Sequence, residues 1–366
     1  MWLIYFPPVI YFVFYLIAFL GDSYSIAVLE RPLMFLLIPI LGYPVFSSDQ
    51  LGKSQHRIFR FYILGIFSII IILLIRATFN SILLTDGELE FRPIIVYSLS
   101  RFNSEYLSVF EHPTYLAMKT LWALALVIYF KDKLFLKRYV RYFMIILLLV
   151  FIFLLSSRTG IVATFMILLL FILNYIKSAA VKVSFIVLMI LLIYPAYRVI
   201  ILNKRINFSL IELRRGIKSS GGDIKNIDVR TREWYSAIQL IKKKPLFGYG
   251  INYQENLIQK YKENNFENEA SNRFNAHNQY LETHLQFGLP GIIILLWILF
   301  GPLLIKINLP YPFLYKVFLI LITVNFMFES MLVRQWGIMF FLLFYFILGV
   351  TNPATEDNIA PDHPLL

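Results

Sequence analysis

Apolar segments of membrane-spanning length recur along the chain and constrain its fold more than any other feature. Soluble domains carry about 25% charged residues, whereas this chain of 366 residues has 15%, together with 59% hydrophobic residues. We therefore expect an all-α integral membrane protein with about ten (10–12) transmembrane helices of about 20 mostly apolar residues each. The expected spans are 2–20, 32–46, 60–78, 112–130, 140–156, 159–176, 182–201, 289–306, 311–328 and 335–350.

The first apolar segment and the overall charge restrict further the class of membrane protein and its partners. The opening "MWLIYFPPVIYFVFYLIAFL" has no basic n-region and is too long and aromatic for a cleaved signal, so we expect it to remain as a span. The absence of cysteine excludes disulfides and thiolate chemistry. The net charge of +12 comes mostly from residues that flank spans or lie in one loop. That distribution favours anionic membrane lipids or phosphate as partners, and not nucleic acid.

Lys and Arg in the short loops predict the orientation of the chain. They gather in alternate loops, between spans two and three, four and five, six and seven, and eight and nine. The positive-inside rule makes that side cytoplasmic, so both termini lie inside and the long loop lies outside. The expected domains are an N-terminal bundle (1–201), a large periplasmic loop containing helices (202–288), C-terminal transmembrane helices (289–350) and a disordered cytoplasmic tail (351–366).

The stretch "LLSSRTGIVATF" places Arg158 in a tight connection between two apolar spans. An arginine near the bilayer interior is costly unless it meets a counter-charge, and such residues are functional candidates. Its guanidinium suits bidentate phosphate binding. The alternative is an arginine that extends to the interface and anchors the helix.

The long loop contains a predicted amphipathic helix from about Thr231 to Lys243, with Asp228 as its N-cap. Its apolar face is predicted to carry Trp234, Ala237, Ile238 and Ile241.

Arg230 and Arg232 lie in the first turn of this helix, where basic residues oppose the helix dipole. That local cost is explained if the arginines and the helix N-terminus hold an anion together. A basic loop resting on anionic headgroups is an equally weighted alternative. In the following "PLFGYGIN", Gly248 and Gly250 lack the third glycine of a dinucleotide fingerprint and are expected to form a tight turn.

The stretch "RFNAHNQYLETHLQFGLPG" supplies the candidate acid–base residue. If a helix runs from about Asn275 to Phe287, His277 and His284 share a face, but no third metal ligand is spaced to match them. A single histidine beside a membrane span suits proton transfer, because imidazole titrates near ambient pH. The alternative is a structural, hydrogen-bonding histidine.

Two further stretches place polar side chains at predicted outer boundaries. They are "FEHPTYLAMK" and "FMFESMLVRQWG". Lys119, about two turns into a predicted span, needs a partner or must extend to the interface. The supporting candidates are His112, Tyr115, Glu329 and Arg334, together with Arg232, Trp234 and Asn278.

The order of these motifs resembles the O-antigen ligase and O-antigen polymerase superfamily over roughly residues 150–300. It runs "SRTG" after a span, then R-x-x-x-W in a large loop, then P-L-x-G-x-G, then "HNQYL" and "GLPG" before a span. The resemblance implies a GT-C-like, inverting glycosyltransferase of the bacterial inner membrane with its active site on the periplasmic side. The implied donor is a glycan on undecaprenyl diphosphate, and no metal or other cofactor is implied.

The resemblance also implies roles for single residues. Arg158 and Arg230 would bind the donor diphosphate, and His277 would activate the acceptor hydroxyl group. Arg230, unlike Arg232, has the four-residue spacing to Trp234.

Several functions remain open at this level. A ligase would transfer the glycan to lipid A–core, and a polymerase would extend a growing lipid-linked glycan. A polysaccharide or lipid-phosphate transporter is a different class, but the sequence has neither repeated halves nor paired broken helices. A non-catalytic scaffold would leave the grouped arginines and histidine unexplained.

Overall fold

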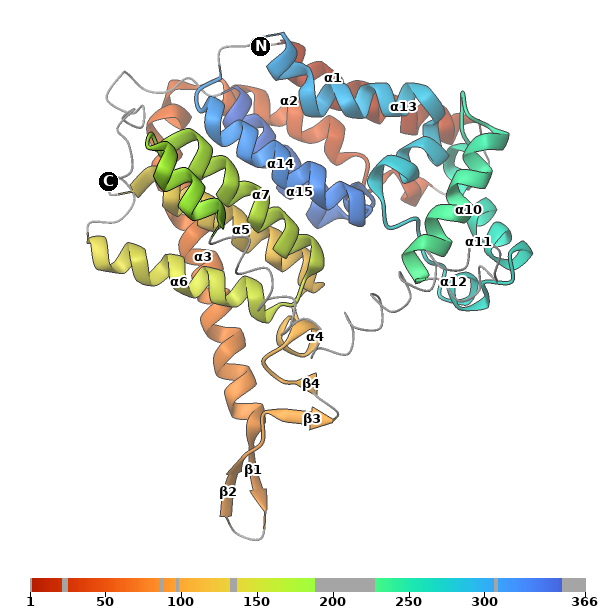
Figure 1. The fold of residues 1–366 in the computed structure, drawn as a ribbon. Coiled ribbons are helices and arrows are strands. Elements are labelled where there is room, and N and C mark those ends of the chain that lie inside the picture. The colour runs from red at the N-terminus through yellow and green to blue at the C-terminus, as the bar shows by residue number, and fades with distance from the viewer. Residues whose placement is uncertain are drawn as a thin grey trace. The chain divides into compact units, whose positions relative to one another are not determined.

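The computed structural model describes residues 2–21, 26–85, 88–96, 99–131, 137–187, 228–305 and 309–350, and most of them are helical (Figure 1). The chain divides into two compact units, each assembled from separate stretches. The first unit comprises Met1–Gly52, Ser209–Tyr315 and Phe326–Ala354, and the second comprises Lys53–Phe208, Lys316–Asn325 and Thr355–Leu366.

Helices occupy the predicted spans that fall in the described residues. They are α1 (Trp2–Leu20), α2 (Met34–Phe46), α3 (Asp49–Ser81), α5 (Pro113–Phe130), α6 (Arg138–Leu154), α7 (Arg158–Tyr175), α13 (Gln279–Leu304), α14 (Pro312–Phe328) and α15 (Gln335–Gly349). Five of these helices, α1, α3, α5, α7 and α13, contain stretches long and apolar enough to cross a membrane, and α2, α14 and α15 are shorter and apolar. The all-α membrane class is thus supported, and the number of spans stays a prediction. The last part of the predicted span 182–201, most of the first part of the long loop, and the tail 351–366 lie outside the described residues.

In the first unit, α1 packs along α13. The hydroxyl groups of Tyr11 and Thr283 are 2.9 Å apart, and both side chains are buried. The rings of Tyr11 and Tyr15 meet the edge of Phe287. Aromatic packing and a hydrogen bond therefore join α1 to the first part of α13, which follows the candidate histidine His277.

Helix α13 bends at Gly288, whose φ of 65° and ψ of −154° are non-helical. The loop containing Gly248 docks at this bend: the N–H of Leu289 donates to the carbonyl oxygen of Leu246 at 3.1 Å, and the N–H of Tyr249 donates to that of Leu285 at 2.7 Å. Gly248 has a φ of 66°, a conformation that favours glycine. The predicted tight turn at Gly248 is confirmed. The bend at Gly288 divides α13 into a polar first part and the apolar span predicted from residue 289.

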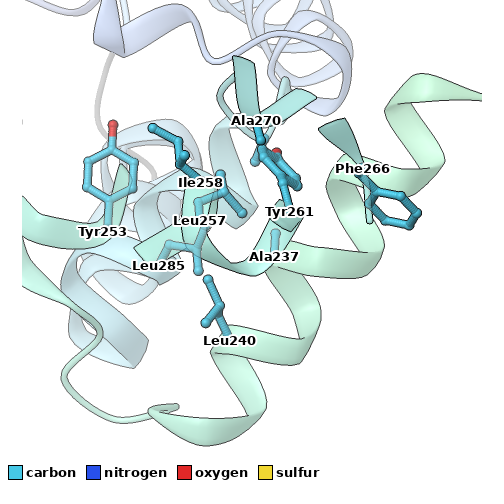
Figure 2. Close-up of a cluster of buried hydrophobic side chains, with 10 residues drawn as sticks. Ala237, Leu240, Tyr253, Leu257, Ile258, Tyr261, Phe266, Ala270 and Leu285 are labelled. Atoms are coloured by element: carbon cyan, nitrogen blue, oxygen red, sulfur yellow. The ribbon is translucent and has the colours of Figure 1, made fainter. Parts of the chain in front are cut away.

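A small helical layer completes the first unit. It consists of α10 (Val229–Lys243), the 3-10 helix η4 (Gly250–Asn252), α11 (Tyr253–Glu263) and α12 (Glu267–Ser271). Figure 2 shows its apolar core, in which Ala237 and Leu240 of α10 meet Leu257 and Tyr261 of α11. Two further 3-10 helices, η1 (Ile26–Leu29) and η5 (Met331–Val333), lie in connections.

The predicted loop helix exists, but its buried face was predicted only in part. Ala237 is buried and Ile241 packs against the core, as predicted. Ile238 is exposed, whereas Glu233, Ser236, Ala237 and Leu240 are buried. Spacings of three and four residues fit more than one face of a short helix, and contacts with α11 select this one. Asp228 stands at the predicted N-cap position but makes no capping hydrogen bond.

The second unit contains α3, α5, α6, α7, the middle of α14 and a polar connection. This connection carries two antiparallel two-stranded sheets that the sequence reading did not predict. They are formed by β1 (Ile82–Thr85) with β2 (Glu88–Phe91) and by β3 (Ile94–Val96) with β4 (Leu99–Ser100), followed by α4 (Ser104–Leu107). Lys119 finds the partner that its position required, because its Nζ lies 2.6 Å from Oε2 of Glu111.

Candidate functional site

His277 lies in a short turn immediately before α13. Its φ is 41°, and its backbone N–H donates to Oδ1 of Asn275 at 3.0 Å. Helix α13 begins one residue after Asn278, whose Oδ1 accepts the N–H groups of Tyr280 at 3.0 Å and Leu281 at 3.1 Å. An asparagine that satisfies two first-turn donors is a strong N-cap, so it starts the helix later than predicted.

The predicted helix from Asn275 to Phe287, with His277 and His284 on one face, is therefore wrong. His277 precedes the helix, and Nε2 of His284 lies 2.9 Å from the carbonyl oxygen of Pro245. His284 thus fastens the glycine-containing loop instead of sharing a site with His277.

His277 is paired with a buried carboxylate. Its Nδ1 lies 2.9 Å from Oε2 of Glu233, whose side chain is 0% exposed, while the His277 side chain is 25% exposed. Burial raises the pKa of Glu233, and the hydrogen bond from His277 opposes that shift only in part. Burial lowers the pKa of His277, but the hydrogen bond and charge of Glu233, aided by Glu329, outweigh burial and the nearby Arg230 and raise it above its usual value.

Arg230 lies one turn from Glu233 on α10 and contacts the turn after α14. Its Nη2 is 2.9 Å from Oε1 of Glu329, and its Nη1 donates to the carbonyl oxygen of Phe328. The indole of Trp234 packs against the ring of Phe328 with 6.2 Å between ring centroids. Among the described residues, no hydrogen-bond partner is found for the buried Nε1 of Trp234. The predicted residues Arg230, Trp234 and Glu329 are thus neighbours.

Arg232 points to a different partner. Its Nε lies 2.6 Å from Oε1 of Glu269, which is 1% exposed, and its guanidinium lies over the ring of Phe266. This arginine stabilises the packing of α10 on α12, and its environment differs from that of Arg230.

The turn after α14 is fastened to the histidine turn through Asn278. Nδ2 of Asn278 donates to the carbonyl oxygen of Met327 at 3.1 Å, and its backbone N–H donates to Oγ of Ser330 at 3.2 Å. Asn278 therefore caps α13 and joins two segments that are about fifty residues apart in sequence.

Glu282 ties the same two turns together from inside the unit. Its buried Oε2 accepts the N–H of Ala276 at 2.9 Å and the hydroxyl of Ser330 at 3.2 Å. The side chain of Gln279 adds a further link, because its Oε1 accepts the N–H of Leu332 at 2.7 Å. These bonds hold His277, Arg230 and Glu329 in one fixed arrangement.

Arg158, His112 and Tyr115 belong to the second unit. Arg158 is exposed and is the first residue of α7, where Oγ of Ser157 caps the helix by accepting the N–H of Gly160 at 3.1 Å. A Cβ on Gly160 would lie 2.8 Å from that of Ala117, so α7 and α5 pack closely there.

His112 is the N-cap of α5, and its Nδ1 accepts the N–H of Thr114 at 3.4 Å, while Tyr115 is buried. In the first unit, Arg334 is exposed at the N-cap position of α15. The geometry therefore groups His277, Arg230, Trp234, Asn278 and Glu329, and it gives His112 a capping role.

The sequence reading missed Glu233 and Glu282. Glu233 shares a helix face with Ala237 and Leu240 at spacings of four and seven residues, which is the available sequence signal for its burial. Glu282 follows the histidine by five residues, in the first turn of a largely apolar helix.

Comparison with known proteins gives one family. Residues 143–296 match the Wzy_C family model, described as O-antigen ligase. The matched range contains Arg158, Arg230, Glu233 and His277. A search of curated proteins finds no match.

Proposed function

We propose that this member of the O-antigen ligase and polymerase superfamily transfers a glycan from a lipid-linked diphosphate donor to an acceptor hydroxyl group. The donor would be an undecaprenyl-diphosphate-linked glycan, and the site would face the periplasm of a bacterial inner membrane. The transfer would be inverting and would need no metal. The observation that carries the proposal is the pairing of His277 with Glu233 next to Arg230.

His277 would act as the general base. The acceptor hydroxyl oxygen attacks C1 of the donor sugar and loses its proton to Nε2 of His277 as the new glycosidic bond forms. Proton transfer by a positioned side chain contributes about 10²–10⁴-fold to a rate. The imidazole is partly exposed, so an acceptor can reach it.

The arginines would stabilise the leaving group. When the bond from C1 to the phosphate oxygen breaks, negative charge develops on the lipid diphosphate, and fixed donors in a water-poor site stabilise such charge by several kcal/mol. Arg230 would exchange the Glu329 carboxylate and the Phe328 carbonyl oxygen for phosphate oxygens. Arg158 would also bind donor phosphate, as the resemblance of its motif implies.

A reconstituted transfer assay tests the proposal. With an undecaprenyl-diphosphate glycan and an acceptor in proteoliposomes, His277→Ala should lower turnover by about 100-fold or more. The control His284→Gln retains a donor for the Pro245 carbonyl oxygen and should transfer normally. Near-normal turnover of His277→Ala would show that this histidine is only structural.

The acceptor distinguishes two forms of the reaction. A deletion strain that lacks polymer on lipid A–core while lipid-linked polymer accumulates would identify a ligase. A strain whose core carries single repeats would identify a polymerase.

A further inference from the structure

We infer that Glu233 is a positioning residue that holds the His277 ring through Nδ1, so that Nε2 faces the acceptor. The inference rests on the proposed function, because it takes His277 as the base. It assigns a role to a residue that lies one turn from Arg230 and that the motif comparison did not select.

The hydrogen bond fixes the proton on one ring nitrogen. A carboxylate only accepts, so at 2.9 Å the Nδ1 atom of His277 must donate to Oε2 of Glu233. In a neutral imidazole the other nitrogen then has a free lone pair. A base that is to take a proton from a hydroxyl group needs that lone pair at Nε2, where a partly exposed ring can meet substrate.

The surroundings restrict the ring further. The Phe274 ring meets that of His277 edge to face, with 5.8 Å between centroids. The backbone of His277 is held by Asn275 on one side and by the capping residue Asn278 on the other. Because the backbone is held, the imidazole can still rotate, and the hydrogen bond to Glu233 restricts that rotation.

A comparison of two buried acids argues against a purely structural role for Glu233. Glu269 is as buried as Glu233, but it pairs with the permanent charge of Arg232. In the described residues, Glu233 bonds through Oε2 to a histidine that can be neutral, and its buried Oε1 has no hydrogen-bond partner. Burying a poorly paired carboxylate is costly. Its presence is explained if the function of His277 requires it.

The charges around His277 fix the sign of the pH effect. Glu233 and Arg230 face it from α10, Glu329 faces it from the turn after α14, and Glu282 lies close to it on α13. Glu233 and Glu329 raise the pKa of His277, and Arg230 lowers it. Removing the Glu233 charge therefore lowers this pKa. Since the neutral ring is the base, the acid limb of the pH–rate profile must move to lower pH.

The variant Glu233→Gln tests the inference. It should lower kcat by about 10–100-fold, by analogy with the range seen when groups that orient a metal-binding histidine are lost, while KM for the acceptor stays within about two-fold. The acid limb should shift to lower pH. The control Glu269→Gln can weaken folding but should leave the limb in place. A Glu233→Gln enzyme with wild-type kcat and an unmoved limb would overturn the inference.

The second variant Glu233→Asp guards against a folding failure. It keeps the charge but shortens the side chain, so its acid limb should stay near that of wild type while kcat falls. Wild-type kcat in this variant would also overturn the inference, because the position of the carboxylate would then be irrelevant.

A measurement without turnover separates this inference from the proposed function. Diethyl pyrocarbonate modifies neutral imidazole, and peptide mass spectrometry can follow His277 across a pH series in detergent-solubilised full-length protein. Modification of Glu233→Gln should reach its half-maximal rate at lower pH than that of wild type, and coincident curves would overturn the pairing. A clear shift in a protein that transfers no glycan would support the pairing and overturn the proposed function.

Discussion

Gly288→Ala should strongly destabilise the first unit. The φ of 65° and ψ of −154° at Gly288 are accessible almost only to glycine, and forcing another residue there costs about 1–3 kcal/mol. An added Cβ would lie 2.6 Å from the backbone nitrogen of Phe247 and closer still to the carbonyl group of Leu246. Such overpacking adds about 1–3 kcal/mol. The expected loss of stability is therefore about 2–6 kcal/mol.

The clash has no soft side chain to absorb it. Both contacting groups are backbone of the docked loop, which is held on α13 by the hydrogen bonds to Leu289 and Leu285. Relief of the clash must displace the loop and break those bonds. Gly248→Ala should behave similarly, because its φ is 66° and its Cβ would lie 2.6 Å from the carbonyl oxygen of Leu285.

Thermal unfolding in detergent, followed by size-exclusion chromatography after heating, measures the effect. We expect the apparent Tm of Gly288→Ala to fall by at least about 5 °C. The matched control is Gly65→Ala in the middle of α3, where an added Cβ meets nothing within 4 Å. That change should be neutral or stabilise by up to about 1 kcal/mol. If Gly288→Ala and Gly65→Ala both have the same apparent Tm as wild type, the docked loop does not contribute to stability as argued.

Further substitutions have defined outcomes. Arg232→Ala leaves the buried Glu269 unpaired and should destabilise the protein by about 3–5 kcal/mol in thermal unfolding. Arg230→Lys should fold normally and lose transfer activity. If Arg158→Lys, Arg230→Lys and Arg232→Lys all have equal, mild effects on transfer, binding of lipid headgroups would be favoured instead. Asn278→Ala removes an N-cap worth about 0.5–2 kcal/mol and should lower both Tm and kcat, and an unchanged Tm would contradict the capping geometry. In this cysteine-free chain, an impermeant thiol reagent applied from the periplasmic side should label Asn265→Cys but not Lys177→Cys, and the reverse pattern would invert the proposed topology.

Several helices could be predicted closely because a bilayer imposes a local requirement on composition, although α3 begins at Asp49, well before its predicted span 60–78. A span must satisfy its own backbone hydrogen bonds and be apolar over its length, so α1, α5 and α15 begin and end within about two residues of their predicted limits. The hairpins β1–β2 and β3–β4 need no such apolar composition. Their short strands depend on pairing partners rather than on composition, and no alternating pattern of apolar residues predicted them.

The site could be predicted in part. Motif order placed His277 and Arg230 among the candidates, and the Glu329 stretch among the supporting elements; the structure brings these three residues close together, and their roles stay predictions. The partners of these residues come from distant segments, so local patterns could not identify them. Glu233 was not among the predicted site residues, because an acid on an amphipathic helix is usually exposed, and the contact with the histidine turn accounts for its burial.

The basic composition of the loop did not predict whether Arg230 or Arg232 is available to bind an anion. Arg230 is 32% exposed and bound to Glu329 at the edge of the site, whereas Arg232 is 18% exposed and bound to Glu269 inside the helical layer. If a diphosphate takes Arg230, the buried Glu329 loses this counter-charge but keeps His277 close to it. If it takes Arg232, Glu269 stays buried without its counter-charge, at a cost of several kcal/mol. The greater exposure of Arg230, more than the net charge of the loop, is the reason that we propose it as the arginine that binds a donor.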